Sequence, residues 1–275
     1  MRSWRLDDGR QTLVLAARRE RIPQVVYWGA RLPDDEDLST LHAAHILDVT
    51  GGMLDESPEL SLCPEATRSF PGQPDLIVRD TDGTPLLPKF CYEADAQTDH
   101  GLQLTYLDED NALRLQFSFD LDPDTHLITA RTRVEATRPS LLHWLAAPVV
   151  PTPQLSDEMI DVSGRWCGEF QLNRTAWSPG IRYRENHTGR TGHEHFPGLL
   201  VPCRGATNTT GEVYGFHYGW SGGHRMAAEE LPDGRRQVQW GHAARMETEA
   251  QTYFASAPLY MVYRNDGLNG CAVAF

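Results

Sequence analysis

The stretch ALRLQFSFDLD at residues 112–122 constrains the fold most, because its apolar and polar residues alternate strictly. Such alternation is typical of a β-strand, whose successive side chains point to opposite faces of the sheet. After the turn DPDT at 122–125, the segment HLITARTRVEAT alternates again. The two segments therefore predict a hairpin with one buried face. The apolar side is formed by Leu113, Leu115, Phe117 and Phe119, and the polar side by Arg114, Gln116 and Ser118.

Strand signals recur along the chain, whereas helix signals are sparse. Segments rich in β-branched and aromatic residues predict strands; they lie at 11–17, 24–29, 213–220 and 257–263, and a second hairpin is expected from 224–231 and 235–243. One helix is expected within a long loop, at 34–48, with Leu38, Leu41 and His45 at helical spacing. The proline-rich segment 137–154 is expected to cross between two sheets. This pattern predicts an all-β fold, a large antiparallel sandwich.

Composition and charge restrict the possible partners. The net charge of −13 repels phosphate backbones and anionic lipid, so we expect neither nucleic acid nor membrane as a partner, while sugars remain possible. The N-terminal MRSWRLDDGR has no apolar signal region, and the longest apolar run, LLHWLAAPVV at 141–150, is too short to span a bilayer. The five cysteines are scattered and form no C-x-x-C pair, which indicates reduced, mostly buried thiols in a cytoplasmic protein.

The segment RENHTGRTGHEHFPG at 184–198 concentrates histidine, glutamate and arginine in fifteen positions. His193 and His195 would share one face of a strand, and His187 or Glu185 could supply a third zinc ligand. The alternative is that these groups bond to the backbone and to Arg184 or Arg190 at a sheet edge. Since neither an HExxH motif nor a cysteine pair is present, we favour the structural alternative and expect no metal.

Residues for acid–base catalysis or sugar binding do not stand out by local sequence. Glycoside hydrolysis needs two carboxylates on either side of the scissile bond, and the candidates are Asp48, Asp55, Glu56, Glu169, Glu185 and Glu194. In YGWSGGHRM at 218–226, Trp220 with Ser221 and His224 could form a sugar platform. We favour the alternative, a bulged strand end with a glycine turn. We expect most of the remaining tryptophans to lie in the core.

The stretch GRWCGEFQLNRTAWSPGIRYRENHTGRTGHEHFPG at 164–198 resembles the N-terminal domain of bacterial α-galactosidases of glycoside hydrolase family 36. The segments VVYWGARL (25–32), GEVYGFHYGWSGGHRM (211–226) and APLYMVYRNDGLNG (257–270) also match family segments, in family order. The matching positions in the first stretch are Gly164, Arg165, Gly168, Glu169 and Phe170, then Arg184, Glu185, Asn186, Gly189, Arg190, Thr191, His193, Phe196 and Pro197.

The resemblance implies that residues 1–275 form a single domain, a large two-sheet antiparallel supersandwich of the galactose-mutarotase type. It also implies that hydrolysis of α-galactosides belongs to a following (β/α)8 barrel, whose two catalytic aspartates have no counterpart in this sequence. We therefore expect the barrel to lie outside this chain, and the chain alone to be inactive, with no catalytic residue, no metal and no cofactor. The expected partners are that barrel, other subunits of a homo-oligomer and, indirectly, an α-galactoside.

The family also implies that a loop of this domain reaches toward the barrel of a neighbouring subunit. By resemblance this loop is 34–60, and the substrate-binding candidates are Asp48 and Asp55, together with Trp220. The segment 184–198 is then a structural signature at a domain or subunit contact. A domain built to pack on other units would expose an apolar patch when isolated, so we expect the chain to self-associate.

Two other functions remain open. A free-standing carbohydrate-binding protein would use Trp220 and the loop 34–60. An aldose epimerase would need a histidine as acid and a glutamate as base, and His193 with Glu194 or Glu185 could serve.

Overall fold

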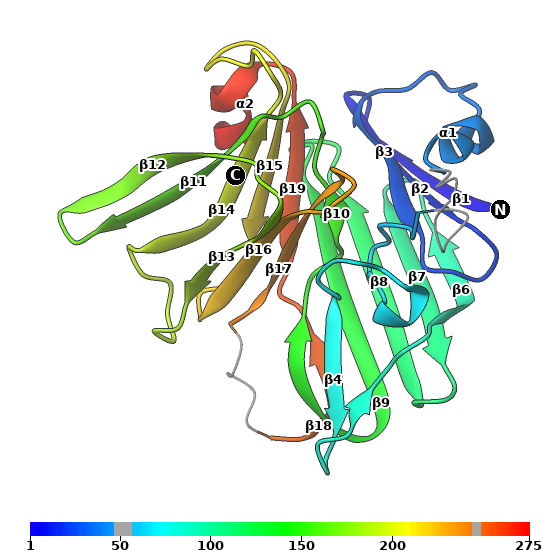
Figure 1. Ribbon diagram of the computed structural model, residues 1–275. Coiled ribbons are helices and arrows are strands. Elements are labelled where there is room, and N and C mark those ends of the chain that lie inside the picture. Colours follow the sequence, from blue (N-terminus) through cyan, green and yellow to red (C-terminus); the bar gives the residue numbers. More distant parts are fainter. Residues whose placement is uncertain (47–56, 244–248) are drawn as a thin grey trace.

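The computed structural model describes residues 1–46, 57–243 and 249–275, and most of these residues lie in antiparallel strands (Figure 1). Three sheets are present, of 12, four and three strands. The predicted all-β class and antiparallel sandwich are confirmed. Asp48 and Asp55 lie outside the described residues.

The 12-strand sheet forms the back of the molecule in Figure 1. Its main path runs β12–β11–β14–β15–β19–β9–β8–β7–β6, while β18 and β4 also pair with β9, and β5 pairs with β4. The strands are β4 (Leu76–Asp80), β5 (Pro85–Leu86), β6 (Cys91–Gln97), β7 (Gly101–Asp108), β8 (Leu113–Leu121), β9 (Ile128–Leu145), β11 (Glu158–Arg165), β12 (Gly168–Ala176), β14 (His195–Pro202), β15 (Val213–Tyr218), β18 (Gln251–Ala255) and β19 (Leu259–Arg264).

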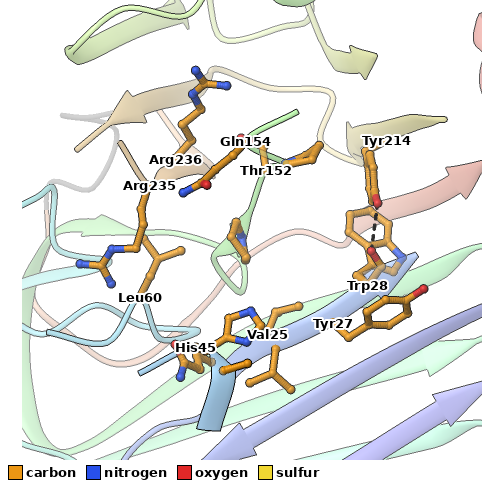
Figure 2. A pocket seen from close by; sticks show the side chains of 15 residues that line it. Val25, Tyr27, Trp28, His45, Leu60, Thr152, Gln154, Tyr214, Arg235 and Arg236 are labelled. Carbon is orange, nitrogen blue, oxygen red and sulfur yellow. Dashed lines mark hydrogen bonds between the residues drawn. The ribbon is translucent and has the colours of Figure 1, made fainter. Parts of the chain in front are cut away.

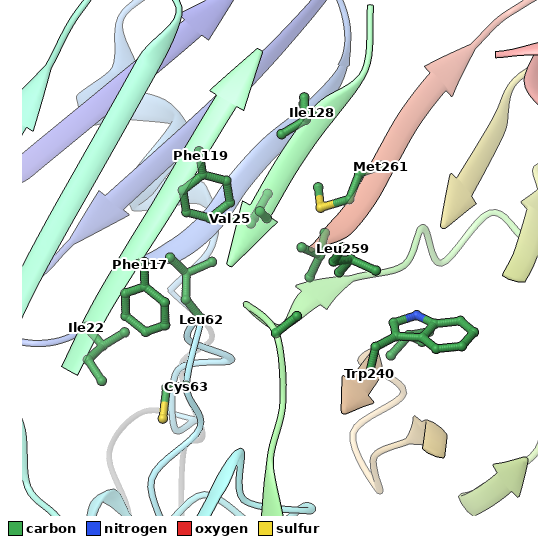
Figure 3. Packing of buried hydrophobic residues seen from close by; sticks show 14 of the residues in the cluster. Ile22, Val25, Leu62, Cys63, Phe117, Phe119, Ile128, Trp240, Leu259 and Met261 are labelled. Atoms are coloured by element: carbon green, nitrogen blue, oxygen red, sulfur yellow. The ribbon is translucent and has the colours of Figure 1, made fainter. Parts of the chain in front are cut away.

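Two smaller sheets lie in front of the large one. The three-strand sheet has the order β1–β2–β3 and the four-strand sheet the order β10–β17–β16–β13. One continuous hydrophobic cluster joins all three sheets, with Leu13 from β2, Phe117 from β8 and Trp240 from β17 among its members (Figure 3). The strands are β1 (Arg2–Asp7), β2 (Gln11–Ala17), β3 (Gln24–Ala30), β10 (Val150–Pro151), β13 (Gly180–Asn186), β16 (His224–Glu230) and β17 (Arg236–His242).

Both predicted hairpins are confirmed. The strands β8 and β9 pair from Leu113 opposite Ala136 to Leu121 opposite Ile128. Every second residue of β8, from Leu113 to Leu121, is buried. The strands β16 and β17 form the second hairpin, in the four-strand sheet. Alternation predicted β8 because only one face of that strand meets the core, whereas β16 and β17 are buried on both faces over most of their length.

The predicted crossing between two sheets at 137–154 takes place in the second half of that segment, and its first half belongs to a strand. The strand β9 continues to Leu145, and Pro139 lies where it changes neighbours: it pairs with β8 up to Ala136 and with β4 from Ser140. A proline is tolerated at such a point because no ladder hydrogen bond from its nitrogen is needed. The chain reaches the four-strand sheet at Ala146, which bridges to Gly241 of β17, and joins that sheet as β10.

The helix α1 (Leu38–Ala44) is shorter than the predicted span 34–48. Asp37 caps it by accepting a hydrogen bond from the backbone N–H of Ser39 at 2.9 Å. Of the residues at helical spacing, Leu38 and Leu41 are partly buried and His45 is exposed, while His42 is the buried residue of this helix. A short 3-10 helix, Ala66–Arg68, follows later in the chain.

The helix α2 (Gly267–Val273) was not predicted and lies on the outer face of the large sheet, away from the main core. Its Cys271 packs against Val213 of β15 and Val262 of β19. The close approach depends on Gly215, because a Cβ there would lie 2.5 Å from the sulfur of Cys271. Nearby ring contacts join His217 to Phe275, whose ring centroids are 6.0 Å apart.

Several side chains are more exposed than the sequence predicts. Cys63 and Cys271 are buried, but Cys91 and Cys167 are exposed, so the prediction of mostly buried thiols is wrong. Cys91 begins β6 at one end of the main sheet path, and Cys167 lies in the turn between β11 and β12 at the other end. Neither position has a sheet neighbour on both sides. Within the described residues, no helix has the length and apolar character to cross a membrane.

Candidate functional site

The segment 184–198 makes contacts that hold strands and loops together. The Nε of Arg184 donates to Oδ2 of Asp161 at 3.0 Å, and Asp161 is only 3 % exposed. The side-chain amide of Asn186 donates to the carbonyl oxygen of Arg190 at 2.7 Å, which closes the loop. The backbone N–H of Thr191 donates to the carbonyl oxygen of Ser221 at 2.6 Å. These are the backbone and arginine contacts expected of a structural segment.

The histidines of this segment do not converge. His193 lies before β14, beside the ring of Trp166 and with its Nδ1 3.9 Å from Glu169. His187 pairs instead with Glu185, at 2.6 Å between Nε2 and Oε2. In the described parts of the chain, no group of three or more His, Cys, Asp or Glu residues is placed to hold a metal ion. The acid–base pairing of His193 with Glu185 is also not formed, since Glu185 contacts His187 and Arg225.

Two further histidines are enclosed between the sheets. His224 is 1 % exposed, and burial lowers its pKa to about 4. Burial likewise lowers the pKa of His195. Both line a cavity of about 10 Å³ together with Asp161 and Arg184, which leaves no room for a substrate. The buried ring of His224 is therefore a neutral packing group at pH 7, and His195 is partly buried beside it.

Trp220 follows β15 and is 43 % exposed. Its ring meets that of His242 edge to face, with centroids 4.5 Å apart. A Cβ at Gly222 would lie 2.5 Å from its indole nitrogen, so a glycine is needed there for this ring position. The carbonyl oxygen of Trp220 accepts a hydrogen bond from Oγ1 of Thr191 at 3.3 Å. Trp220 is thus a supported, partly exposed aromatic surface, as a sugar platform requires. It does not line the cavity of about 450 Å³ between β3 and the β10–β17 edge.

A cavity of about 450 Å³ opens between β3, α1 and the β10–β17 edge (Figure 2). Its size lies in the range of small-molecule sites. One wall is aromatic, and there the hydroxyl of Tyr214 donates to the carbonyl oxygen of Trp28 at 3.0 Å. The lining residues are Gln24, Val25, Val26, Tyr27, Trp28, Ala44, His45, Leu60, Pro151, Thr152, Pro153, Gln154, Tyr214, Arg235 and Arg236.

The chemistry of this cavity suits binding rather than hydrolysis. Its described lining contains no aspartate or glutamate, whereas glycoside hydrolysis needs two carboxylates. The two arginines are engaged by carboxylates, Arg235 by Asp233 and Arg236 by Glu230. The hydroxyl of Thr152 is buried and has no hydrogen-bond partner among the described residues. The cavity could accept a neutral polar ligand.

Sequence reasoning did not find this cavity. Its walls come from six separate parts of the chain, between residues 24 and 236, and none carries a motif. The candidates from loop 34–60 cannot be compared with it, because Asp48 and Asp55 lie outside the described residues. The end of that loop is nevertheless placed next to it, since Leu60 lines the cavity.

Comparison with known proteins identifies a family. Residues 21–247 match the family described as the glycosyl hydrolase family 36 N-terminal domain. An α-galactosidase of Escherichia coli is 31% identical over 276 residues, which covers 97% of this chain and 37% of the relative. The α-galactosidase AgaA of Geobacillus stearothermophilus is 25% identical over 190 residues, covering 67% and 26%. The chain thus spans only about a third of the length of these relatives.

Solved structures show the same fold. A variant of AgaA from Geobacillus stearothermophilus in complex with raffinose superposes with a TM-score of 0.86 at 20% sequence identity, over 99% of this chain and 42% of that chain. An α-galactosidase from Lactobacillus brevis gives a TM-score of 0.84 at 16% identity, over 99% and 40%. At these identities the likeness establishes the fold of the domain.

Proposed function

The chain belongs to the glycosyl hydrolase family 36 N-terminal domain family, and we propose that it acts as the non-catalytic N-terminal domain of an α-galactosidase. In this role residues 1–275 form one supersandwich domain, and a separate catalytic domain hydrolyses α-galactosides. The domain supports that catalytic domain and the assembly of a homo-oligomer. The substrate class is suggested by the AgaA variant, whose structure holds raffinose.

One observation carries this proposal. A family match over 227 of 275 positions goes together with a cavity of ligand size, about 450 Å³, that has no carboxylate in its described lining. A retaining or inverting glycosidase cannot work without its two acids. The chain therefore contributes shape and contacts, while the acids come from another domain. The five unpaired cysteines support a reducing compartment such as the cytoplasm.

The loop 34–60 is proposed as the part of the domain that approaches the active site of a neighbouring subunit, through Asp48 and Asp55. Support comes from its described end, where Arg235 donates to the hydroxyl of Ser57 at 2.9 Å and fixes the return of the loop to the sandwich. Trp220 is proposed as an additional sugar contact because its ring is supported and partly exposed.

A chimera tests the proposal. The chain replaces the segment of the Escherichia coli α-galactosidase to which it is 31% identical, so that the catalytic part stays covalently attached. We expect the chimera to hydrolyse p-nitrophenyl α-galactoside and the isolated chain not to. Hydrolysis by the isolated chain would contradict the proposal, and so would a chimera that unfolds cooperatively but is inactive.

A second candidate function is carbohydrate binding by the chain alone. The cavity of about 450 Å³ and the exposed ring of Trp220 favour it. A calorimetric titration of the isolated chain with melibiose separates the two functions. Saturable binding that Trp220→Ala removes would support the second function, and absence of binding would leave the first.

A further inference from the structure

The hairpin of β11 and β12 carries large apolar side chains in water. Trp166 is 75% exposed, Phe170 69% and Leu172 68%. The hairpin projects from the upper left of the molecule in Figure 1. Single exposed apolar residues are ordinary, but a contiguous group of this size marks an interaction surface.

Ring contacts connect this hairpin to the outer face of the large sheet. The ring centroids of Phe170 and Phe196 are 6.0 Å apart, those of Phe196 and His217 are 5.1 Å apart, and those of His217 and Phe275 are 6.0 Å apart. The contacts therefore run from β12 across β14 and β15 to the residues that follow α2. We call Phe170, Leu172, Phe196 and Phe275 the outer aromatic face; Trp166 lies at the turn of the same hairpin, where its ring contacts His193.

The outer aromatic face is held in place from behind. The side-chain amide of Asn173 donates to Asp161 at 2.9 Å and to Ser163 at 2.7 Å, on the side of the hairpin opposite to Phe170 and Leu172. Arg174 pairs with Glu158 across the two strands. Because these contacts fix the hairpin, its apolar side is presented in one conformation, which reduces the entropy lost on docking.

The face lies where the next part of a family member would begin. The family domain is N-terminal, and relatives and solved structures carry more than half of their length outside the part matched here. Because the family domain is N-terminal and this chain is matched over 99% of its length, we expect the remaining chain of a relative to follow the element equivalent to α2. In this protein α2 leads directly to Phe275, which belongs to the face. A domain tethered at this point has a high effective concentration at the face.

A second copy of this chain is a weaker candidate for the same face. Two copies would each carry a net charge of −13, and this repulsion makes a pairing of copies weaker than the docking of a tethered domain, although the uncovered face of the isolated chain can still pair. A tethered domain has a high effective concentration at the face because the connection is short, and its own charge need not be negative. The position of α2 and the charge of the chain therefore favour the tethered domain.

We propose that the outer aromatic face is the docking surface for the catalytic domain of the α-galactosidase. This inference rests on the proposed function, because it assigns a surface to the partner named there. It makes the β11–β12 hairpin, with its Gly164-to-Phe170 turn region, the element that sets how the two domains pack.

Two exposed thiols of the natural sequence provide the test. Cys167 lies in the hairpin turn, next to Trp166, and Cys91 lies on β6 at the other end of the main sheet path. Both are alkylated with N-ethylmaleimide in the isolated chain and in the chimera described above, and each rate is followed by peptide mass spectrometry. We expect alkylation of Cys167 to slow by about tenfold or more in the chimera, while Cys91 keeps its rate, because thiol reactivity follows exposure.

The outcomes separate this inference from the proposed function. An active chimera in which Cys167 reacts as fast as in the isolated chain would overturn the docking surface and leave the proposed function in place. Equal protection of both thiols in an active chimera would also overturn it. A folded but inactive chimera would overturn the proposed function, and the docking surface with it.

A pair of substitutions gives an independent readout. Phe170→Asp with Leu172→Asp places charge on the face, and Leu87→Asp, at a residue that is 63% exposed beside β5, is the matched control. Both variants should leave the thermal midpoint of the isolated chain unchanged. In the chimera we expect the double variant to lose about tenfold or more in activity and the control to lose none. Equal activities of the two would contradict the docking surface.

Discussion

The guanidinium of Arg235 donates a hydrogen bond to the carbonyl oxygen of Pro58 at 2.6 Å, across 177 residues of chain. The same side chain reaches the hydroxyl of Ser57 and the carboxylate of Asp233. One arginine in the turn between β16 and β17 therefore fixes the point where the loop 34–60 rejoins the sandwich.

Arg235→Ala should lower the free energy of unfolding by about 2 kcal/mol. The substitution removes a charged donor, and the carbonyl oxygen of Pro58 then lacks its hydrogen-bond partner. Urea unfolding measures the change. The matched control is Arg204→Ala, whose exposed side chain pairs with Asp157 at 2.8 Å and should contribute nothing measurable. If both variants unfold at the same urea concentration, Arg235 does not anchor the loop.

Breaking the ion pair between Arg184 and Asp161 should cost more stability than Arg235→Ala, since Asp161 is only 3% exposed. Arg184→Met leaves a buried carboxylate without its nearest cation and should cost about 3 kcal/mol in the free energy of unfolding. Adding Asp161→Asn removes that charge and should recover at least about 1 kcal/mol. A double variant that is less stable than Arg184→Met alone would contradict this account.

The stability of the chain should depend on pH through the buried carboxyl group of Glu65. Burial raises its pKa to about 7, although Phe90 and Arg68 oppose the shift. The folded state therefore keeps this proton between about pH 4.5 and 7 while the unfolded state loses it, so stability falls as pH rises through that window. The loss attributable to Glu65 should approach about 3 kcal/mol. In Glu65→Gln, urea unfolding at pH 5 and pH 7.5 should show a smaller difference than in the wild type, and an unchanged difference would refute the assignment.

The isolated chain should self-associate at high concentration through its uncovered apolar surface. The expected result in light scattering is a mass that grows with protein concentration and shrinks in the double variant with Phe170→Asp and Leu172→Asp. The control variant Leu87→Asp should behave as the wild type does. A sharp monomer at micromolar concentration would contradict the prediction.

Local alternation predicted much of the fold. In β8, the buried positions Leu113, Leu115 and Phe117 follow directly from the sequence, because one face of the strand meets the core and the other meets water. The continuation of β9 past Pro139 could not be predicted, since it depends on β4 arriving as a new neighbour from elsewhere in the chain.

The candidate sites were less predictable than the fold. Trp166 and Phe170 belong to strand-like segments that look like core, and their exposure follows from the position of β12 at one end of the main sheet path. The cavity beside β3 brings together Tyr27, Thr152 and Arg235, which are far apart in sequence. No local sequence pattern indicates that these residues line one cavity, because the cavity forms only when the sheets pack together.

The most direct test of the account is the rate at which the chimera hydrolyses p-nitrophenyl α-galactoside, measured beside the isolated chain and beside the Escherichia coli enzyme without its matched segment. The account predicts activity in the chimera alone, since the domain supplies shape and contacts while the catalytic acids come from another domain. Activity of the isolated chain, or full activity of the enzyme without the segment, would contradict it.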